Sequence, residues 1–177
     1  LHLILMLKLY IMEKLMIQGN VPISWKTEDY VNVSWRSNEN HYNHIDADAK
    51  NTKQQYGESV GVYICNDVPT IFMDIANRFG LKKYVVALNK MTPGQILPWH
   101  VDKYPTYIKR NNISDDEQIM RIILFLHNQE PGQQLWIKDK LCVGLAGTYY
   151  GWGRGVIHMA ANLSVTSRYT LQITGVQ

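Results

Sequence analysis

Short alternating segments dominate the second half of the chain. Apolar and polar residues follow the two-residue period of a strand, in which successive side chains point to opposite faces of a sheet. The pattern predicts eight strand segments separated by turn signals, at residues 84–91, 96–101, 119–127, 134–138, 141–144, 148–152, 156–160 and 169–174. This spacing favours a closed barrel or jelly roll over alternating strands and helices.

The first part of the chain has fewer regular patterns. Residues 31–35 alternate and predict a short strand, and residues 60–65 predict another. Residues 37–55 are rich in Asn, Asp and His and predict a loop. Between Thr70 and Gly80 the apolar residues share one helical face, and a glycine is suited to the C-terminal end of a helix. We therefore expect a helix there.

The N-terminal 17 residues are strongly apolar, but Lys8, Glu13 and Lys14 interrupt them. These charges come before the ~20 apolar residues that a membrane-spanning helix needs. The segment also lacks the basic leader and small-residue cleavage site of a signal peptide. We expect it to pack on the core or on a second copy of the chain, and we expect a cytoplasmic protein without membrane contact.

Length and pattern together predict a single domain. The chain has 177 residues, and compact domains cluster near ~100–200 residues. We expect residues 1–83 to form an extension that packs on the barrel and residues 84–177 to form the barrel core. The expected fold class is mainly β, a closed barrel or jelly roll with N-terminal helical and strand additions.

Composition excludes several classes of protein. Apolar residues make up 46% of the chain and charged residues 19%, which excludes intrinsic disorder and a coiled coil. The net charge is +3 and the basic residues are scattered, so nucleic-acid binding is not expected. Cys65 and Cys142 lie in apolar segments without a C-x-x-C spacing, which favours free thiols in a reducing compartment over a disulfide.

Candidate metal ligands occur at the end of the second predicted strand. His100 and Asp102 are two residues apart, so in a strand their side chains point to the same face. A neutral imidazole and a carboxylate suit a divalent first-row metal. A third ligand is needed, and His158 is preferred to His127 because the second and seventh strands of a jelly roll can lie close across the barrel mouth.

Candidate anion-binding residues lie on two other predicted strands. Arg168 and Thr170 share one face at the start of the last strand, and a guanidinium with a hydroxyl can hold a carboxylate inside a barrel. Arg121 lies in an otherwise apolar segment, where a charge needs water or a partner. Two interpretations of Arg121 remain open: it binds the other end of an organic acid or a substrate carboxylate, or it faces water.

Residues 93–175 resemble the iron(II)- and 2-oxoglutarate-dependent dioxygenases, which have a double-stranded β-helix fold. The resemblance is carried by His100-x-Asp102, the distal His158 and Arg168-x-Thr170, in that order. The local sequence is most similar to the aspartyl/asparaginyl β-hydroxylase-like branch, although that branch often lacks the carboxylate ligand. The resemblance implies iron(II) bound by His100, Asp102 and His158, with Arg168 and Thr170 holding 2-oxoglutarate. It also implies consumption of O₂ and hydroxylation of a peptide side chain or a small molecule.

Two other functions remain open from the sequence. A cupin-type metalloenzyme would use the same three ligands without 2-oxoglutarate, and it would not need Arg168 and Thr170. A non-catalytic β-barrel binding module would need no metal at all.

Three further features have an open role. A second polar cluster, made of His41, His44, Asp46 and Asp48, is expected to be a solvated loop; a substrate-mouth segment and a second metal site are its alternatives. Residues 103–118 directly follow the first two ligands and have no regular pattern, so they are either a substrate-covering segment or a plain surface loop. Trp99 and Trp152 either wall the metal pocket or pack in the core.

Overall fold

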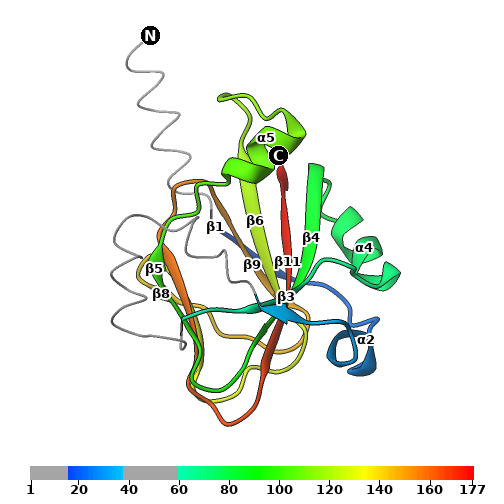
Figure 1. Ribbon diagram of the computed structural model, residues 1–177, viewed down its shortest axis with the longest axis vertical. Helices are drawn as coiled ribbons and strands as arrows, with labels where there is room; N and C mark the ends of the chain where they lie inside the picture. The colour runs from blue at the N-terminus through cyan, green and yellow to red at the C-terminus, as the bar shows by residue number, and fades with distance from the viewer. Residues whose placement is uncertain (1–15, 38–59) are drawn as a thin grey trace.

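Two antiparallel sheets form most of the protein, for which a computed structural model describes residues 16–37 and 60–177 (Figure 1). The described elements, in chain order, are β1 (Met16–Asn20), α2 (Glu28–Val31), β2 (Arg36–Ser37), β3 (Tyr63–Cys65), α4 (Thr70–Asn77), β4 (Lys82–Met91), β5 (Ile96–His100), α5 (Pro105–Asn111), β6 (Ile119–Phe125), β7 (Gln133–Ile137), β8 (Lys140–Leu141), β9 (Thr148–Gly153), β10 (His158–Asn162) and β11 (Arg168–Val176).

The strand order identifies the fold. Among the described residues, one sheet has seven strands in the order β1-β9-β6-β11-β4-β3-β2, and the other has four in the order β5-β10-β7-β8. From β4 to β11 the chain changes sheet at every connection except the β7–β8 hairpin. This is the winding of a double-stranded β-helix, so the mainly β fold class predicted from the sequence is confirmed.

The alternation of side chains along β6 and β11 divides the interior into two layers. Ile122 and Leu124 of β6 and Leu171 of β11 point to the face that Phe72 of α4 covers, where all four are essentially fully buried. The residues between them point the other way, toward the four-stranded sheet. Figure 1 shows β4, β6 and β11 side by side at the centre, with α4 beside β4.

The turn between β4 and β5 has the predicted form. Gly94 has φ +84°, which is the left-handed region required at the third position of a type II turn, and the Gln95 N–H donates to the Thr92 carbonyl at 3.1 Å. The turn joins β4 of the seven-stranded sheet to β5 of the four-stranded sheet. His100, the last residue of β5, is buried between the sheets.

Three sequence-based predictions of elements were wrong. The strand predicted at residues 31–35 is absent, because Val31 is the last residue of the short helix α2, and the nearby strand β2 is Arg36–Ser37. At the start of this helix the Lys26 N–H donates to the Asp29 carboxylate at 2.7 Å, which supports a local turn that alternation cannot reveal. Residues 103–118 contain the helix α5. The strand predicted at residues 141–144 is shorter than expected and contains only Leu141 of these residues. It belongs to the two-residue strand β8, which pairs with the end of β7.

The N-terminal part of the chain adds strands to the larger sheet. β1 pairs with β9 and forms one edge of the seven-stranded sheet, while β3 pairs with β4 and β2 forms the other edge. Within the described residues, no helix is long and apolar enough to cross a membrane.

Candidate metal centre and anion-binding cavity

Three candidate ligands meet where β5 ends and β10 begins. These strands are neighbours in the smaller sheet, and His158 lies directly opposite His100 in their register. The two strands were expected to approach each other across the barrel mouth. This was wrong in detail, because they pair side by side in one sheet. The potential ligand atoms of His100, Asp102 and His158 all lie within 4.8 Å of one another. Because donor–metal bonds are ~2 Å long, this His-Asp-His group could hold a metal ion.

Asp102 reaches the group from outside the strand. β5 ends at His100, so the strand-face argument for Asp102 was wrong in its premise. The carboxylate nevertheless lies beside both rings, with Oδ1 at 3.8 Å from His100 Nε2 and Oδ2 at 3.4 Å from His158 Nε2. The Asp102 side chain therefore points toward the two imidazoles, although the residue lies beyond the end of β5.

Backbone carbonyls orient both imidazoles. Nδ1 of His100 lies 2.7 Å from the Pro98 carbonyl oxygen, and Nδ1 of His158 lies 3.0 Å from that of Val156. A carbonyl only accepts, so Nδ1 carries the proton and Nε2 keeps the lone pair with which an imidazole binds a metal ion. Burial lowers the pKa of both histidines, that of His158 to about 3, despite the opposing effect of Asp102. Both rings are therefore neutral, as metal ligands must be.

Arg121 and Tyr104 hold the Asp102 carboxylate. Arg121 Nη1 donates to Asp102 Oδ2 at 3.0 Å, and the Tyr104 hydroxyl donates to the same oxygen at 3.2 Å. The Arg121 guanidinium also lies over the Tyr104 ring at 5.0 Å and donates to the Gln172 amide oxygen at 3.1 Å. Of the two interpretations of Arg121, solvent exposure is contradicted: its side chain is only 13% exposed and lines the same cavity as the triad.

Arg168 is buried, and two of its side-chain nitrogen atoms have no hydrogen-bond partner. It is 5% exposed, and its Nε and Nη2 atoms have no hydrogen-bond partner, while Nη1 contacts the Met91 sulfur at 3.6 Å. Its guanidinium lies 5.7 Å from the centre of the Phe125 ring. Burial lowers the pKa of Arg168 to about 10, so the side chain is still charged at neutral pH.

One cavity joins the triad to the buried arginine. It has a volume of about 600 Å³ and lies between the two sheets. Thr170 and Gln172 alternate with Leu171 along β11, so they line the cavity on the same side as Arg168. The sequence-predicted site residues that line it are His100, Asp102, Arg121, His158, Arg168 and Thr170.

Helix α5 forms the cavity wall beside the triad. Pro105 occupies its first turn, and Tyr104 and Asn112 flank it in the left-handed region, with φ of 55° and 47°. Such values are uncommon for residues other than glycine, and here one of them turns the Tyr104 side chain toward Asp102. Residues 103–118 therefore contain a helix that lines the cavity, and they are not a structureless loop.

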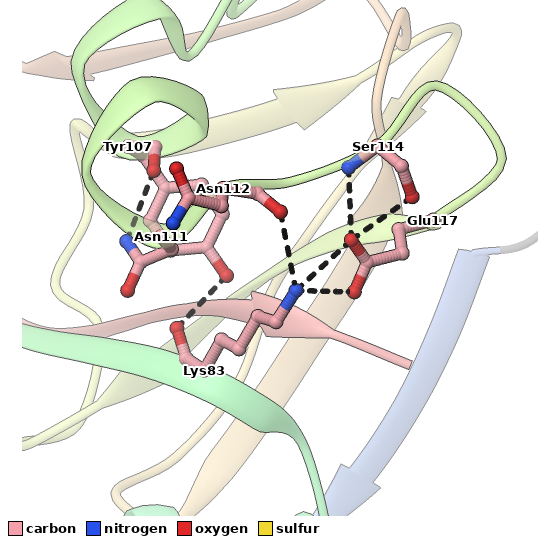
Figure 2. A network of polar contacts seen from close by, with 6 residues as sticks. All are labelled: Lys83, Tyr107, Asn111, Asn112, Ser114 and Glu117. Carbon is pink, nitrogen blue, oxygen red and sulfur yellow. Dashed lines mark hydrogen bonds and ion pairs between the residues drawn. The ribbon is translucent and has the colours of Figure 1, made fainter.

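A polar network fixes α5 to the start of β4 (Figure 2). Lys83 Nζ donates to both carboxylate oxygens of Glu117, at 2.7 and 3.0 Å, and to the Asn112 carbonyl at 3.4 Å. Glu117 also accepts from the backbone N–H of Ser114 at 2.9 Å, and the Tyr107 hydroxyl donates to the Lys83 carbonyl at 3.0 Å. Beneath the helix, Tyr104, Tyr107, Ile113, Ile119 and Val176 form a small apolar cluster.

Sequence reasoning missed two residues of the site. Gln172 accepts from both Arg121 and Asn89, at 3.1 Å each, and its spacing of two from Thr170 could have identified it. Tyr104 was considered only as part of a loop. No spacing signal marks it, because its inward direction depends on a positive φ that the sequence does not reveal.

Other residues singled out from the sequence lie elsewhere. Trp152 is fully buried, lines the cavity and packs on the His158 ring at 4.7 Å between centroids. Trp99 is 47% exposed and pairs with Trp136 outside the cavity. His127 accepts the Tyr169 N–H through Nε2 at 3.0 Å, away from the triad. The cluster of His41, His44, Asp46 and Asp48 lies outside the described residues, as does the apolar segment 1–15.

Comparisons with known proteins give only distant similarities. No protein-family model and no curated protein matches the chain. A prolyl-4-hydroxylase from Pseudomonas putida is 16% identical with a TM-score of 0.49, covering 81% of this chain and 92% of its own. A predicted oxalate decarboxylase from Thermotoga maritima is 15% identical with a TM-score of 0.43, covering 66% and 82%. A cupin protein from Bacteroides fragilis is 16% identical with a TM-score of 0.39, covering 58% and 73%. These values transfer no activity to this chain, and the fold assignment rests on the strand order.

Proposed function

We propose that this protein is an iron(II)- and 2-oxoglutarate-dependent dioxygenase that hydroxylates a C–H bond of a small molecule or a peptide side chain. The observation that carries the proposal is the buried, unpartnered guanidinium of Arg168 in the same cavity as a His-Asp-His group. A metal site alone would fit many cupin-type enzymes, whereas the arginine adds a requirement for an organic anion.

The energetics of Arg168 support an anionic ligand. Removing a guanidinium from water costs several kcal/mol unless hydrogen bonds or an opposite charge offset it. Nε and Nη2 of Arg168 have no such partner in the described structure, and the sole acid lining the cavity, Asp102, is already engaged by Arg121. A bidentate carboxylate matches these unpartnered N–H groups. 2-Oxoglutarate supplies that carboxylate at one end and a metal-chelating 2-oxo acid at the other.

The chain's own residues have separable roles in this proposal. His100, Asp102 and His158 would hold iron(II), and Arg168 with Thr170 would hold the distal carboxylate of 2-oxoglutarate. When bound, the iron would couple decarboxylation of 2-oxoglutarate to succinate and CO₂ with transfer of one O₂ oxygen to a substrate C–H. Arg121 and Tyr104 keep the Asp102 carboxylate beside the imidazoles, and α5 limits the access of water.

Iron binding tests the ligand assignment directly. The protein and its His100→Ala, Asp102→Ala and His158→Ala variants would be loaded anaerobically with Fe(II), freed of excess metal, and assayed for bound iron and for succinate release in air. We expect the native protein to retain one iron and each variant to lose iron and turnover. His127→Gln serves as a matched control, because this histidine lies outside the triad, and it should retain both.

The result separates the proposal from its alternatives. Bound iron without any succinate release, in the presence of 2-oxoglutarate, would favour a cupin-type metalloenzyme that does not use this cosubstrate. Full iron retention in all three triad variants would contradict the assignment of the ligands. A native protein that binds no iron would contradict the metal centre and favour a non-catalytic β-barrel binding module.

A further inference from the structure

The walls of the cavity carry a strong excess of positive charge. Among the described residues that line it, four side chains are cationic, and Asp102 is the sole acid. Asp115, Asp116 and Glu117 follow α5 along the chain, but none of them lines the cavity. The four cations are Lys103, Arg110, Arg121 and Arg168.

These cations occupy two levels of the cavity. Arg121 and Arg168 lie inside, where Arg121 is paired with Asp102 and Arg168 is assigned to the cosubstrate. Lys103 and Arg110 are exposed residues of the wall, so they lie where the cavity reaches the protein surface. The proposed function assigns neither residue of the second pair to the metal or the cosubstrate.

The position of Arg110 is set by the folded helix. Tyr107, Arg110 and Asn111 are three to four residues apart, so they share the face of α5 that lines the cavity. Lys109 is also exposed but is absent from the cavity wall. The network that joins Lys83 to Glu117 and to the Asn112 carbonyl holds the helix in this orientation (Figure 2).

We propose that the substrate is a small organic anion, a carboxylate with an apolar body, whose charge is bound at the cavity mouth by Arg110 and Lys103. This inference rests on the proposed function. Counted over the described lining residues, four cations and one carboxylate, together with a divalent metal and a 2-oxoglutarate dianion, give the loaded cavity a charge of about +3. A cleft with this excess concentrates anions and rejects cations.

The size and lining of the cavity support a small molecule with an apolar part. A volume of about 600 Å³ is within the ~300–1,000 Å³ of small-molecule sites, and it must also hold the cosubstrate. Beyond the charged groups, its walls near α5 include aromatic and aliphatic side chains, with Tyr84, Val85, Pro105 and Tyr107 among them, beside the polar Thr106 and Asn111. An aliphatic or aromatic body would pack on these side chains while its carboxylate faces the two cations.

Matched pairs of acids and amides test the inference. Protein loaded anaerobically with Fe(II) would first be titrated with 2-oxoglutarate by calorimetry, and then with hexanoate, benzoate and phenylacetate, each compared with its own primary amide. We expect at least one carboxylate to bind about tenfold or more tightly than its amide at low salt, with the difference shrinking as salt rises. Arg110→Gln and Lys103→Gln should each reduce the binding of that carboxylate and leave the amide unchanged.

Lys109→Gln is the control for a general loss of positive charge, because it removes the neighbouring charge outside the cavity wall. It should bind the carboxylates as the native protein does. The inference is overturned if no carboxylate binds more tightly than its amide, or if Arg110→Gln and Lys103→Gln behave like Lys109→Gln. Failure of 2-oxoglutarate to bind in the first titration would instead contradict the proposed function, so the two outcomes are distinct.

Discussion

Arg168 carries an unusual energetic cost at the scale of single residues. Its charge is buried, and two of its three nitrogen atoms have no partner. Thr170 and Gln172, on the same face of β11, give the surrounding wall a polar character. A group that costs stability in the ligand-free protein and gains a partner on binding is typical of a binding site.

Replacement of Arg168 by methionine should therefore separate stability from binding. In Arg168→Met, we expect the ligand-free melting temperature to stay the same or rise, because an apolar side chain of similar length removes the desolvation cost. Affinity for 2-oxoglutarate should fall about 100-fold, equivalent to about 3 kcal/mol. Thermal denaturation and calorimetry measure the two effects, and the exposed Arg154→Met is the control. A large loss of stability without a loss of affinity would mean that Arg168 is structural.

The buried histidines predict how stability depends on pH. The pKa of His158 is lowered to about 3 and that of His100 is also lowered, so the folded apoprotein keeps both neutral while the unfolded chain protonates them below about 6.5. The unfolded state then binds more protons, and stability falls as the pH drops from about 6.5 toward 3, by at most about 1.4 kcal/mol per pH unit for each histidine. His158→Gln should flatten this slope in denaturation measurements on apoprotein. An unchanged slope would contradict the buried, neutral state of His158.

Individual residues differ in how far their position could be predicted. The shared face of Arg168 and Thr170 could be predicted because a two-residue spacing on a strand places side chains on one face, and Gln172 follows the same rule. The interpretation of Arg121 could not be decided from the sequence. Its partner Asp102 lies in the segment after β5, and the two side chains meet only in the folded protein. Tyr104 could not be found at all because its direction depends on backbone φ.

Helix α5 is the element that links the site to the surface. It has seven residues, too short to be stable alone, so its packing and the polar network around Lys83 must hold it in place. Its sequence is polar enough to resemble a loop, although Pro105 at the start and apolar residues at helical spacing are helix signals. Residues 31–35 were wrongly predicted to be a strand from their alternating pattern. In so short a segment, the helical turn that the Asp29 side chain supports overrides a two-residue pattern.

Loss of the Lys83 contacts should loosen α5 without unfolding the protein. In Lys83→Met, the interactions with Glu117 and the Asn112 carbonyl are removed, while the backbone carbonyl that accepts from Tyr107 remains. We expect faster amide hydrogen exchange across residues 105–111 and little change in melting temperature, because an ion pair near the surface contributes little to global stability. Lys82→Met, an exposed neighbour on β4, is the control. Unchanged exchange in α5 would contradict the role of the network.

At the scale of the whole molecule, winding between two sheets creates the site. Strands that are far apart in the chain become neighbours, so His100 and His158 face each other although neither is near the other in sequence. Turn spacing and alternation were sufficient to predict a closed barrel or jelly roll, and the resemblance of residues 93–175 to a known family implied the double-stranded β-helix. They could not predict that β5 and β10 pair directly, because strand order is decided by packing between sheets rather than by local pattern.

The most direct test of the central proposal is whether iron and 2-oxoglutarate bind together through the triad and Arg168. Protein loaded with Fe(II) would be titrated with 2-oxoglutarate under anaerobic conditions while visible absorption is recorded. We expect a weak charge-transfer band that saturates in the native protein and needs about 100-fold more 2-oxoglutarate in Arg168→Met. An iron-loaded native protein that develops no band at any 2-oxoglutarate concentration would contradict the proposal.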